Sequence, residues 1–195
     1  MRCFVIVAHR IPPRGDFSLN DLCGSGGRVD VIARAVTAAL LLSNDVRRDV
    51  EVRIALSNPE GSRLLRFVGS SIRYLSADER STAALVRNAL LRCPSKGETM
   101  ASPGLYVSRG GIEEALVGAE TIVLLEEGAT EPEWRALCDP TFVLSDDLGF
   151  SERERELLRP LCTMRAGLGP LPLHTDHCIA IVNHMMDMAR QSACP

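Results

Sequence analysis

The chain has no long apolar run and no leader-like start. Its apolar runs all fall short of the roughly 18 residues that a membrane-spanning helix needs. The first residues, Met1 to Phe4, begin a strand-like segment with no basic stretch and no cleavage site after it. We therefore expect a soluble, cytoplasmic protein that does not contact a membrane.

Closely spaced cysteines are also missing. The chain has seven cysteines among 195 residues, and none of them forms a C-x-x-C pair. They are Cys3, Cys23, Cys93, Cys138, Cys162, Cys178 and Cys194. Their odd number and wide spacing argue against a disulfide scaffold and against a zinc ribbon. We expect most of them to be buried thiols that pack as small apolar side chains.

Lysine is almost absent, and the net charge is small. Lys96 is the only lysine among 22 basic residues, and the formal net charge is -3. This charge does not indicate a strongly basic surface. Arginine grips phosphate with two hydrogen bonds and stacks on bases, so the bias toward arginine is compatible with RNA binding. Codon usage in a GC-rich genome explains the same bias equally well.

Apolar periodicity predicts strands and helices in alternation. In the first half we expect strands at 2–8, 49–56, 64–68 and 71–75, a helix at 29–43, a second helix that is capped by Ser76 or Asp78 and runs to about 92, and a flexible polar segment at 93–103. In the second half we expect strands at 105–107, 121–125, 141–144 and 163–166, and helices at 111–117, 131–137, 151–161 and 173–190. The alternation predicts an α/β fold, with a mostly parallel sheet and helices on both faces. The length fits one domain that spans residues 1–195.

The loop at 168–173 is the most informative segment of the chain. Pro170 and Pro172 hold its backbone extended, so its leucines stay on the loop instead of starting the last helix. Ligands of parallel sheets bind beyond the carboxyl ends of the strands, where the loops after 125, 144 and 166 meet. The loop suits a flat, partly apolar ligand such as an adenosine, or it is a rigid buried connection.

Several further motifs occur along the chain in a fixed order. They are Asp16-Phe17-Ser18-Leu19-Asn20-Asp21-Leu22, Gly27-Arg28-Val29-Asp30-Val31, Arg47-Arg48-Asp49-Val50, Phe67-Val68-Gly69-Ser70, Ser76-Ala77-Asp78-Glu79-Arg80 and Pro103-Gly104-Leu105-Tyr106-Val107. Together with the 168–173 loop, this ordered set resembles the archaeal family that N1-methylates pseudouridine 54 of tRNA, within the SPOUT class of RNA methyltransferases. The resemblance implies a C-terminal trefoil knot that holds S-adenosyl-L-methionine, a tRNA T-arm as substrate, and a homodimer formed through the knot helices.

The resemblance also implies which residues bind the cofactor. They are Leu125, Ser145, Leu168, Gly169, Pro170, Leu171, Pro172, Leu173 and Cys178. Ser145 stands where the family typically has glycine, and Asp147 stands in place of a frequent histidine. Residues 146 and 147 are otherwise a solvated turn before a helix cap at Ser151. Cys178 is otherwise a buried helix thiol.

The substrate side follows from the chemistry of pseudouridine, whose glycosidic bond at C5 leaves a proton on N1. Methyl transfer needs that proton removed, and nearby cations would stabilise the negative charge that develops on the base. The candidate catalytic residues are Asp30 and Asp78, and the candidate RNA contacts are Arg28, Arg47, Arg48 and Arg80. The alternatives are a helix cap for Asp78 and ordinary solvated arginines for the Arg47-Arg48 pair.

Two other interpretations receive less support. His174, Asp176, His177 and His184 invite a metal site, but no second cluster of ligands accompanies them, so we expect none. The glycines at 24–27 resemble a dinucleotide fingerprint but lack its final glycine and do not directly follow a strand. The alternative functions are a related SPOUT enzyme acting on pseudouridine in ribosomal RNA and a non-catalytic RNA-binding member of the fold.

Overall fold

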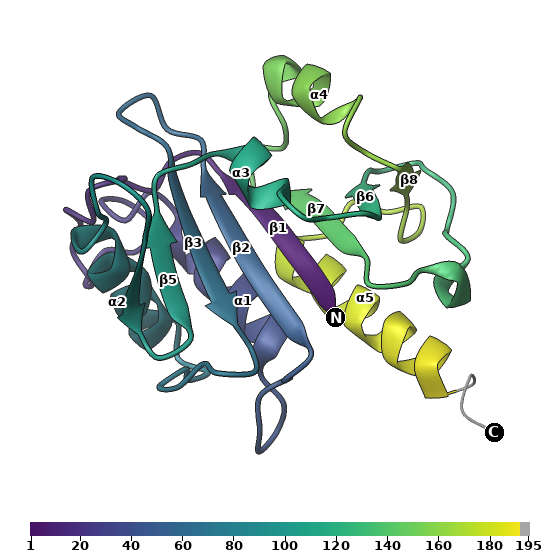
Figure 1. Cartoon of the computed structure of the whole chain (residues 1–195), viewed down its shortest axis with the longest axis horizontal. Coiled ribbons are helices and arrows are strands. Elements are labelled where there is room, and N and C mark those ends of the chain that lie inside the picture. The colour runs from purple at the N-terminus through teal and green to yellow at the C-terminus, as the bar shows by residue number, and fades with distance from the viewer. Residues whose placement is uncertain (192–195) are drawn as a thin grey trace.

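The computed structural model describes residues 1–191, and Cys194 lies outside that range. In this range one eight-stranded sheet is accompanied by five α-helices and a short 3-10 helix, η1 (Trp134–Ala136) (Figure 1). The strands are β1 (Arg2–Ala8), β2 (Val50–Leu56), β3 (Arg63–Val68), β4 (Glu98–Ser102), β5 (Leu105–Ser108), β6 (Ile122–Leu125), β7 (Thr141–Ser145) and β8 (Met164–Ala166). The helices are α1 (Val29–Leu40), α2 (Glu79–Leu91), α3 (Ile112–Leu116), α4 (Glu152–Leu158) and α5 (Thr175–Gln191).

The sheet is mixed, with the strand order β4-β5-β3-β2-β1-β7-β6-β8. The five neighbouring strands β2, β1, β7, β6 and β8 pair in parallel, as the sequence predicts. The pairs β2–β3, β3–β5 and β4–β5 are antiparallel, so a parallel arrangement is wrong for that side. The links from β2 to β3 and from β4 to β5 are too short for the crossover that parallel neighbours require.

Three predicted elements differ in the structure. Residues 71–75 form turns and bends instead of a strand, and Tyr74 has a left-handed backbone with φ 64°. The helix predicted at 131–137 shrinks to η1. The polar segment expected to be flexible contains β4, an edge strand whose partner β5 follows a tight turn at Gly104, where φ is 76°. Polar residues suit an edge strand, so composition alone does not reveal it.

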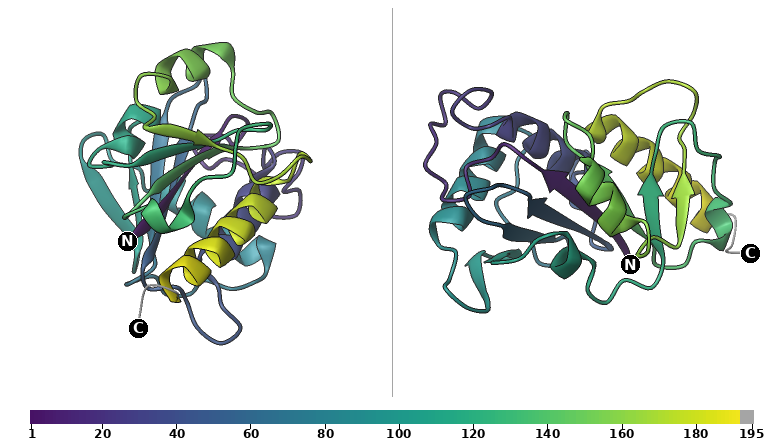
Figure 2. Two further views of the ribbon diagram at one scale, coloured as in Figure 1. Left: turned by 90° about the vertical axis from the view of Figure 1, so that its right-hand side faces the viewer. Right: turned by 90° about the horizontal axis from the view of Figure 1, so that it is seen from above.

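Alternate residues of β1 belong to two different hydrophobic clusters. Phe4, Ile6 and Ala8 pack with apolar residues of α1, α2 and α5. Cys3, Val5 and Val7 pack in a second cluster with residues of α3 and with Leu158 of α4. Because successive strand residues point to opposite sides, β1 is buried on both. Figure 2 shows α5 lying beside α1 on one side of the sheet.

Buried polar contacts fix α5 on the sheet. The side chain of Arg2 is 1% exposed, and its Nη1 donates to Oδ1 and to the carbonyl oxygen of Asn183 at 2.9 and 3.0 Å. Its Nη2 pairs with Asp187 at 2.5 Å. Asn183 also links α5 to α1, because its Nδ2 donates to the carbonyl oxygens of Ala38 and Ala39. Arg2 therefore ties the first strand to α5, the helix that follows the 168–173 loop. Within residues 1–191 no helix has both the length and the apolar character needed to cross a membrane.

Candidate functional site

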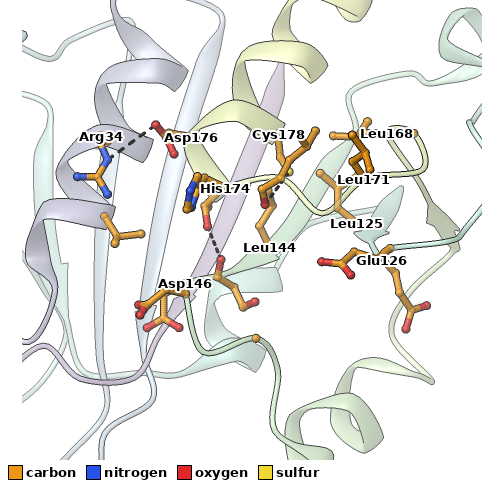
Figure 3. Close-up of a pocket in the computed structure, with 18 of the residues that line it drawn as sticks. Arg34, Leu125, Glu126, Leu144, Asp146, Leu168, Leu171, His174, Asp176 and Cys178 are labelled. Carbon is orange, nitrogen blue, oxygen red and sulfur yellow. Dashed lines mark hydrogen bonds and ion pairs between the residues drawn. The ribbon is translucent and has the colours of Figure 1, made fainter.

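A pocket of about 370 Å³ lies beyond the carboxyl ends of β6, β7 and β8, against α1 and α5 (Figure 3). The three loops that the sequence places at this edge of the sheet therefore do converge. The lining residues, in chain order, are Arg28, Val31, Arg34, Leu125, Glu126, Glu127, Leu144, Ser145, Asp146, Asp147, Gly149, Ala166, Leu168, Gly169, Leu171, Leu173, His174, Thr175, Asp176 and Cys178.

The pocket has an apolar part and a polar part. Figure 3 shows Leu125, Leu168 and Leu171 grouped on one side. On the other side Arg34 of α1 faces Asp176 of α5, with Nε and Oδ2 3.8 Å apart. An apolar wall combined with a few fixed polar groups is typical of a small-molecule site.

Seven of the nine residues predicted to bind the cofactor line this pocket. They are Leu125, Ser145, Leu168, Gly169, Leu171, Leu173 and Cys178. The remaining two, Pro170 and Pro172, belong to the same loop, but their side chains are exposed and are not on the wall. Their fixed backbones can still determine the shape of the loop.

Ser145 takes its place at the end of β7 without strain. Its backbone does not have the positive φ that favours glycine, so this position accepts a serine. The buried side chain of Thr175 donates a 2.7 Å hydrogen bond to the carbonyl oxygen of Ser145. This bond ties the wall of the pocket to the first residue of α5.

The two aspartates after Ser145 have different surroundings. Oδ1 of Asp146 accepts from the backbone N–H of Leu148 at 3.0 Å, so a turn is present, but Asp146 is only 8% exposed and is not solvated as the alternative interpretation expects. Asp147 instead forms ion pairs with Arg10 and, at 3.4 Å, with Arg28. Both aspartates also line the pocket, so the turn and a role at the site are compatible.

His9 is a partly buried residue at this edge that the sequence did not single out. Its Nδ1 lies 2.8 Å from Oδ1 of Asp146, and its Nε2 lies 3.0 Å from Oε2 of Glu154 in α4. The hydrogen bond with Asp146, which outweighs burial, raises the pKa of His9 to about 9. Burial opposes the charged form of Glu154, but hydrogen bonds from Ser57, His9 and Ser151 lower its pKa to about 2. A histidine directly after a buried strand is the only sequence signal for this cluster.

Asp30 lies between two arginines of the pocket wall. Its carboxylate accepts from Nε of Arg28 at 3.0 Å and from Nη1 of Arg34 at 3.1 Å, and its side chain is 5% exposed. Burial opposes its charge, but the hydrogen bonds from both arginines outweigh burial and lower its pKa. Asp30 itself does not line the pocket, whereas both arginines do. Arg34 was not among the predicted site residues.

The other predicted catalytic and RNA-binding residues lie outside the pocket. Oδ2 of Asp78 accepts from the backbone N–H of Ser81 at 2.7 Å and caps α2, and contacts with Ser81 lower its pKa. Arg80, in the first turn of the same helix, is exposed. Arg47 pairs with Asp187 at 2.7 Å, and Arg48 pairs with Asp45 at 3.0 Å.

These last two arginines precede β2, so they lie near the amino ends of the parallel strands, away from the pocket. Each is already paired with a carboxylate. Arg48 is 56% exposed and fits the alternative of an ordinary solvated arginine, whereas Arg47 is only 18% exposed and does not.

The histidines of the last segment do not gather into a cluster. The rings of His174 and His177 meet edge to face with centroids 5.5 Å apart, and His184 is exposed on α5. Over residues 1–191 no three His, Cys, Asp or Glu side chains are placed to hold a metal ion. The absence of a metal from the reaction stays a prediction.

The thiol of Cys178 is not set up as a nucleophile. Burial, together with the nearby charge of Asp176, raises its pKa. Its Sγ lies 3.9 Å from the carbonyl oxygen of Leu173 in the loop. A protonated thiol is a poor nucleophile, so the position suits packing or binding.

Comparison with known proteins agrees with the resemblance noted in the sequence. Residues 1–191 match a family model described as "Putative SAM-dependent RNA methyltransferase". A protein of Methanocella arvoryzae is 43% identical, over 96% of this chain and 99% of its own. Proteins of Methanococcoides burtonii and Haloferax volcanii are 40% and 41% identical, over 96% and 98% of this chain and 96% and 99% of their own. All three relatives are named tRNA (pseudouridine(54)-N(1))-methyltransferase.

A solved structure supports the fold. The crystal structure of Archaeoglobus fulgidus Nep1 bound to S-adenosylhomocysteine superposes with a TM-score of 0.68 and covers 97% of this chain and 99% of its own. At 17% identity this likeness concerns the fold alone. The family resemblance predicted from the ordered motifs is confirmed by the match over residues 1–191 and by relatives that are about 40% identical over nearly the whole chain. The chain belongs to this family of SAM-dependent RNA methyltransferases.

Proposed function

We propose that this protein transfers a methyl group from S-adenosyl-L-methionine to N1 of pseudouridine 54 in the T-arm of tRNA. The observation that carries the assignment is the set of relatives named for this activity, which are 40–43% identical over nearly the whole chain. Because tRNA is the substrate, we place the protein in the cytoplasm. We treat residues 1–195 as one SPOUT domain with helices on both faces of the sheet and a C-terminal trefoil knot. The two hydrophobic clusters around β1 support the placement of helices on both faces.

The pocket fits the cofactor in size and chemistry. A volume of about 370 Å³ falls within the common range for small-molecule sites. Leu125, Leu168 and Leu171 offer an apolar wall for the adenine. Ser145, Gly169, Leu173 and Cys178 complete the binding residues, and Pro170 and Pro172 hold the loop in shape. When bound, the cofactor supplies an electrophilic methyl group.

The polar side of the pocket suits the methyl acceptor. Arg28 and Arg34 line it, and their guanidinium groups can donate to the base carbonyls or to a flanking phosphate. As N1 loses its proton, such donors stabilise the negative charge on the base. Asp30, the first catalytic candidate, holds both guanidinium groups in place through its carboxylate.

A second group of candidates lies close to Arg34 in space, although it is distant in the sequence. Nη1 of Arg34 also pairs with Glu79 at 3.2 Å, so the Asp78 to Arg80 segment borders the same arginine. We keep Asp78 as the second catalytic candidate and Arg80 as an RNA contact. Arg47 and Arg48, at the other end of the sheet, would bind phosphates farther along the tRNA.

The outer face of α5 is the proposed dimer contact. Met188 is 49% exposed, Ile181 is half-buried, and Met185 packs partly against the main core. These three residues lie within two turns of α5, on the helix that also carries Thr175, Asp176 and Cys178 of the pocket. A dimer through this helix would place the two pockets close to the subunit boundary.

The deciding experiment compares two T-arm hairpins that differ only at the target nucleotide. The hairpin with pseudouridine at position 54 should accept methyl from labelled cofactor, and the one with uridine should not, because only pseudouridine has a free N1. Equal transfer to both hairpins would refute the acceptor atom and the substrate assignment. Mass spectrometry of tRNA and ribosomal RNA from a deletion strain separates the tRNA enzyme from its ribosomal alternative. Cofactor binding without any transfer would favour the non-catalytic alternative.

A further inference from the structure

Three segments of the protein meet at His9, just outside the pocket wall. His9 directly follows β1, Asp146 follows β7, and Glu154 lies in the first turn of α4. The side chains of these residues are 15%, 5% and 9% exposed, so the cluster is largely shielded from water. Both ring nitrogens of His9 face carboxylate oxygens, which calls for a proton on each nitrogen and hence a charged ring.

We propose that His9 is a positioning residue for the cofactor pocket: its ring joins Asp146 to Glu154 and thereby fixes the turn at residues 145–149. The proposal rests on the assignment of this pocket to S-adenosyl-L-methionine. Four residues of the turn line the pocket, namely Ser145, Asp146, Asp147 and Gly149. Their positions therefore decide the shape of one wall.

The turn depends on Asp146 for most of its hydrogen bonds. The carboxylate accepts from the backbone N–H of His9 at 2.9 Å and of Leu148 at 3.0 Å. The backbone N–H of Asp146 donates to Val7, and its carbonyl oxygen accepts from Gly149. Movement of the Asp146 side chain would therefore loosen the whole turn.

Glu154 provides a fixed anchor on the other side of the ring. Its Oε2 accepts from the backbone N–H of Ser151 at 2.9 Å and from the Ser151 hydroxyl at 2.8 Å, in a capping box that begins α4. The cap of α4 fixes the position of Glu154, and Glu154 in turn fixes the Nε2 edge of the His9 ring. The Nδ1 edge of the ring then hydrogen-bonds to Asp146 and fixes its side chain. A hydrogen bond between charged groups is stronger than a neutral one, and this arrangement contains two.

The charge on His9 should also make cofactor binding depend on pH. The charged groups that face the ring are Asp146 from the end of β7 and Glu154 from α4, and the neutral Asn58 side chain donates to the His9 carbonyl oxygen at 3.4 Å. The raised pKa of about 9 means that the ring keeps its charge through neutral pH and loses it above pH 9. Without the second proton, one ring nitrogen presents a lone pair to a carboxylate, and that contact becomes repulsive.

The test compares His9→Gln with Arg153→Gln, a control that removes one positive charge from an exposed position on α4. The probe is S-adenosylhomocysteine, titrated by calorimetry at several pH values. We expect His9→Gln to weaken binding by about tenfold near pH 7, because the glutamine amide donates only from its nitrogen and cannot donate from two opposite edges to Asp146 and Glu154 as the charged ring does. Above pH 9 the difference in affinity between the wild type and His9→Gln should become smaller. In the unliganded protein, the amides of Leu148 and Gly149 should exchange hydrogen faster in His9→Gln. Arg153→Gln should resemble the wild type in each measurement.

The outcomes separate this proposal from the function on which it rests. If the wild type binds the probe and His9→Gln binds it equally well, the positioning role is refuted and the function stands. If the wild type does not bind the probe, both are refuted. A lower melting temperature with unchanged affinity would show that His9 supports only the fold, which also overturns the proposal. If His9→Gln does not fold, Glu154→Gln decides instead: it keeps an acceptor for Ser151, and unchanged affinity in that variant overturns the proposal.

Discussion

The most informative stability test is the substitution Arg2→Met. It removes a guanidinium group that is 1% exposed and joins β1 to α5, while methionine fills much of the same space with an apolar side chain. The substitution deletes two hydrogen bonds to Asn183, which is 2% exposed. It also deletes two ion pairs, with Asp187 at 2.5 Å and with Asp49 at 3.6 Å. Asp187 keeps a second partner in Arg47 at 2.7 Å, and Asp49 keeps Arg190.

The expected loss of stability follows from these contacts. A buried acceptor left without its donor costs about 1–3 kcal/mol, and Asn183 would lose a donor at two oxygens. Asp187 and Asp49 are 40% and 43% exposed and both remain paired, so their contributions are small. Nε of Arg2 is buried and has no hydrogen-bond partner, so its removal offsets part of the loss. The net cost should be about 3 kcal/mol, which for a chain of this size corresponds to a fall in melting temperature of about 6–12 °C.

The assay is thermal unfolding followed by circular dichroism, with Arg190→Gln as the matched control. Arg190 also links α5 to the sheet region, through Asp49, but its side chain is 45% exposed. Its loss should therefore cost less than about 1 kcal/mol. Since α5 carries part of the pocket wall, Arg2→Met should also weaken binding of S-adenosylhomocysteine. A melting temperature within about 2 °C of the wild type would refute the reasoning and show that apolar packing alone holds α5.

Four further outcomes are expected. Asp30→Asn should keep cofactor affinity and slow methyl transfer at least tenfold, because it weakens the hold on Arg28 and Arg34 at the acceptor side; unchanged turnover would remove Asp30 from the mechanism. Pro170→Gly should weaken cofactor binding several-fold, measured by calorimetry, with little change in melting temperature, because it frees a loop that must be ordered. If the proposed dimer forms through α5, Ile181→Glu should give a monomer or an aggregate in light scattering, and a soluble dimer would place the interface elsewhere. Folding lowers the pKa of Glu154 from 4.5 to about 2, so its contribution to the free energy of unfolding is present above pH 4.5 and is lost as pH falls toward 2. Between pH 4.5 and 2 the free energy of unfolding of Glu154→Gln, measured by denaturant titration, should therefore fall less steeply than that of the wild type.

Hydrophobic periodicity was a good guide to the elements of the core. A strand buried on both sides, such as β1, has an almost continuous apolar sequence, and α1 repeats its apolar residues at helical spacing. The failures are at positions where local preference is weak. The edge strand β4 has the sequence Glu-Thr-Met-Ala-Ser, and it is a strand because β5 pairs with it across a tight turn. Pairing between distant residues does not leave a periodic pattern in a polar segment.

The site was predictable to the level of segments, and less so to the level of contacts. The alternation of strands and helices, with the rule that ligands bind at the carboxyl ends of parallel strands, indicated three converging loops, and the pocket contains all three. Which side chains face the pocket depends on packing. Pro170 belongs to the loop but is not on the wall, whereas Arg34 is on the wall through its position on α1.

The sequence by itself determined the family, the α/β character and the order of the core elements, because these depend on local pattern and on the order of motifs. Only the tertiary structure decided the partners of buried charges. Arg2 finds Asp187 and Asn183 at the far end of the chain, and His9 finds Asp146 and Glu154 across two other segments. A buried charge must be paired, but the amino-acid sequence does not identify its partner, because the partner depends on which elements the fold brings together.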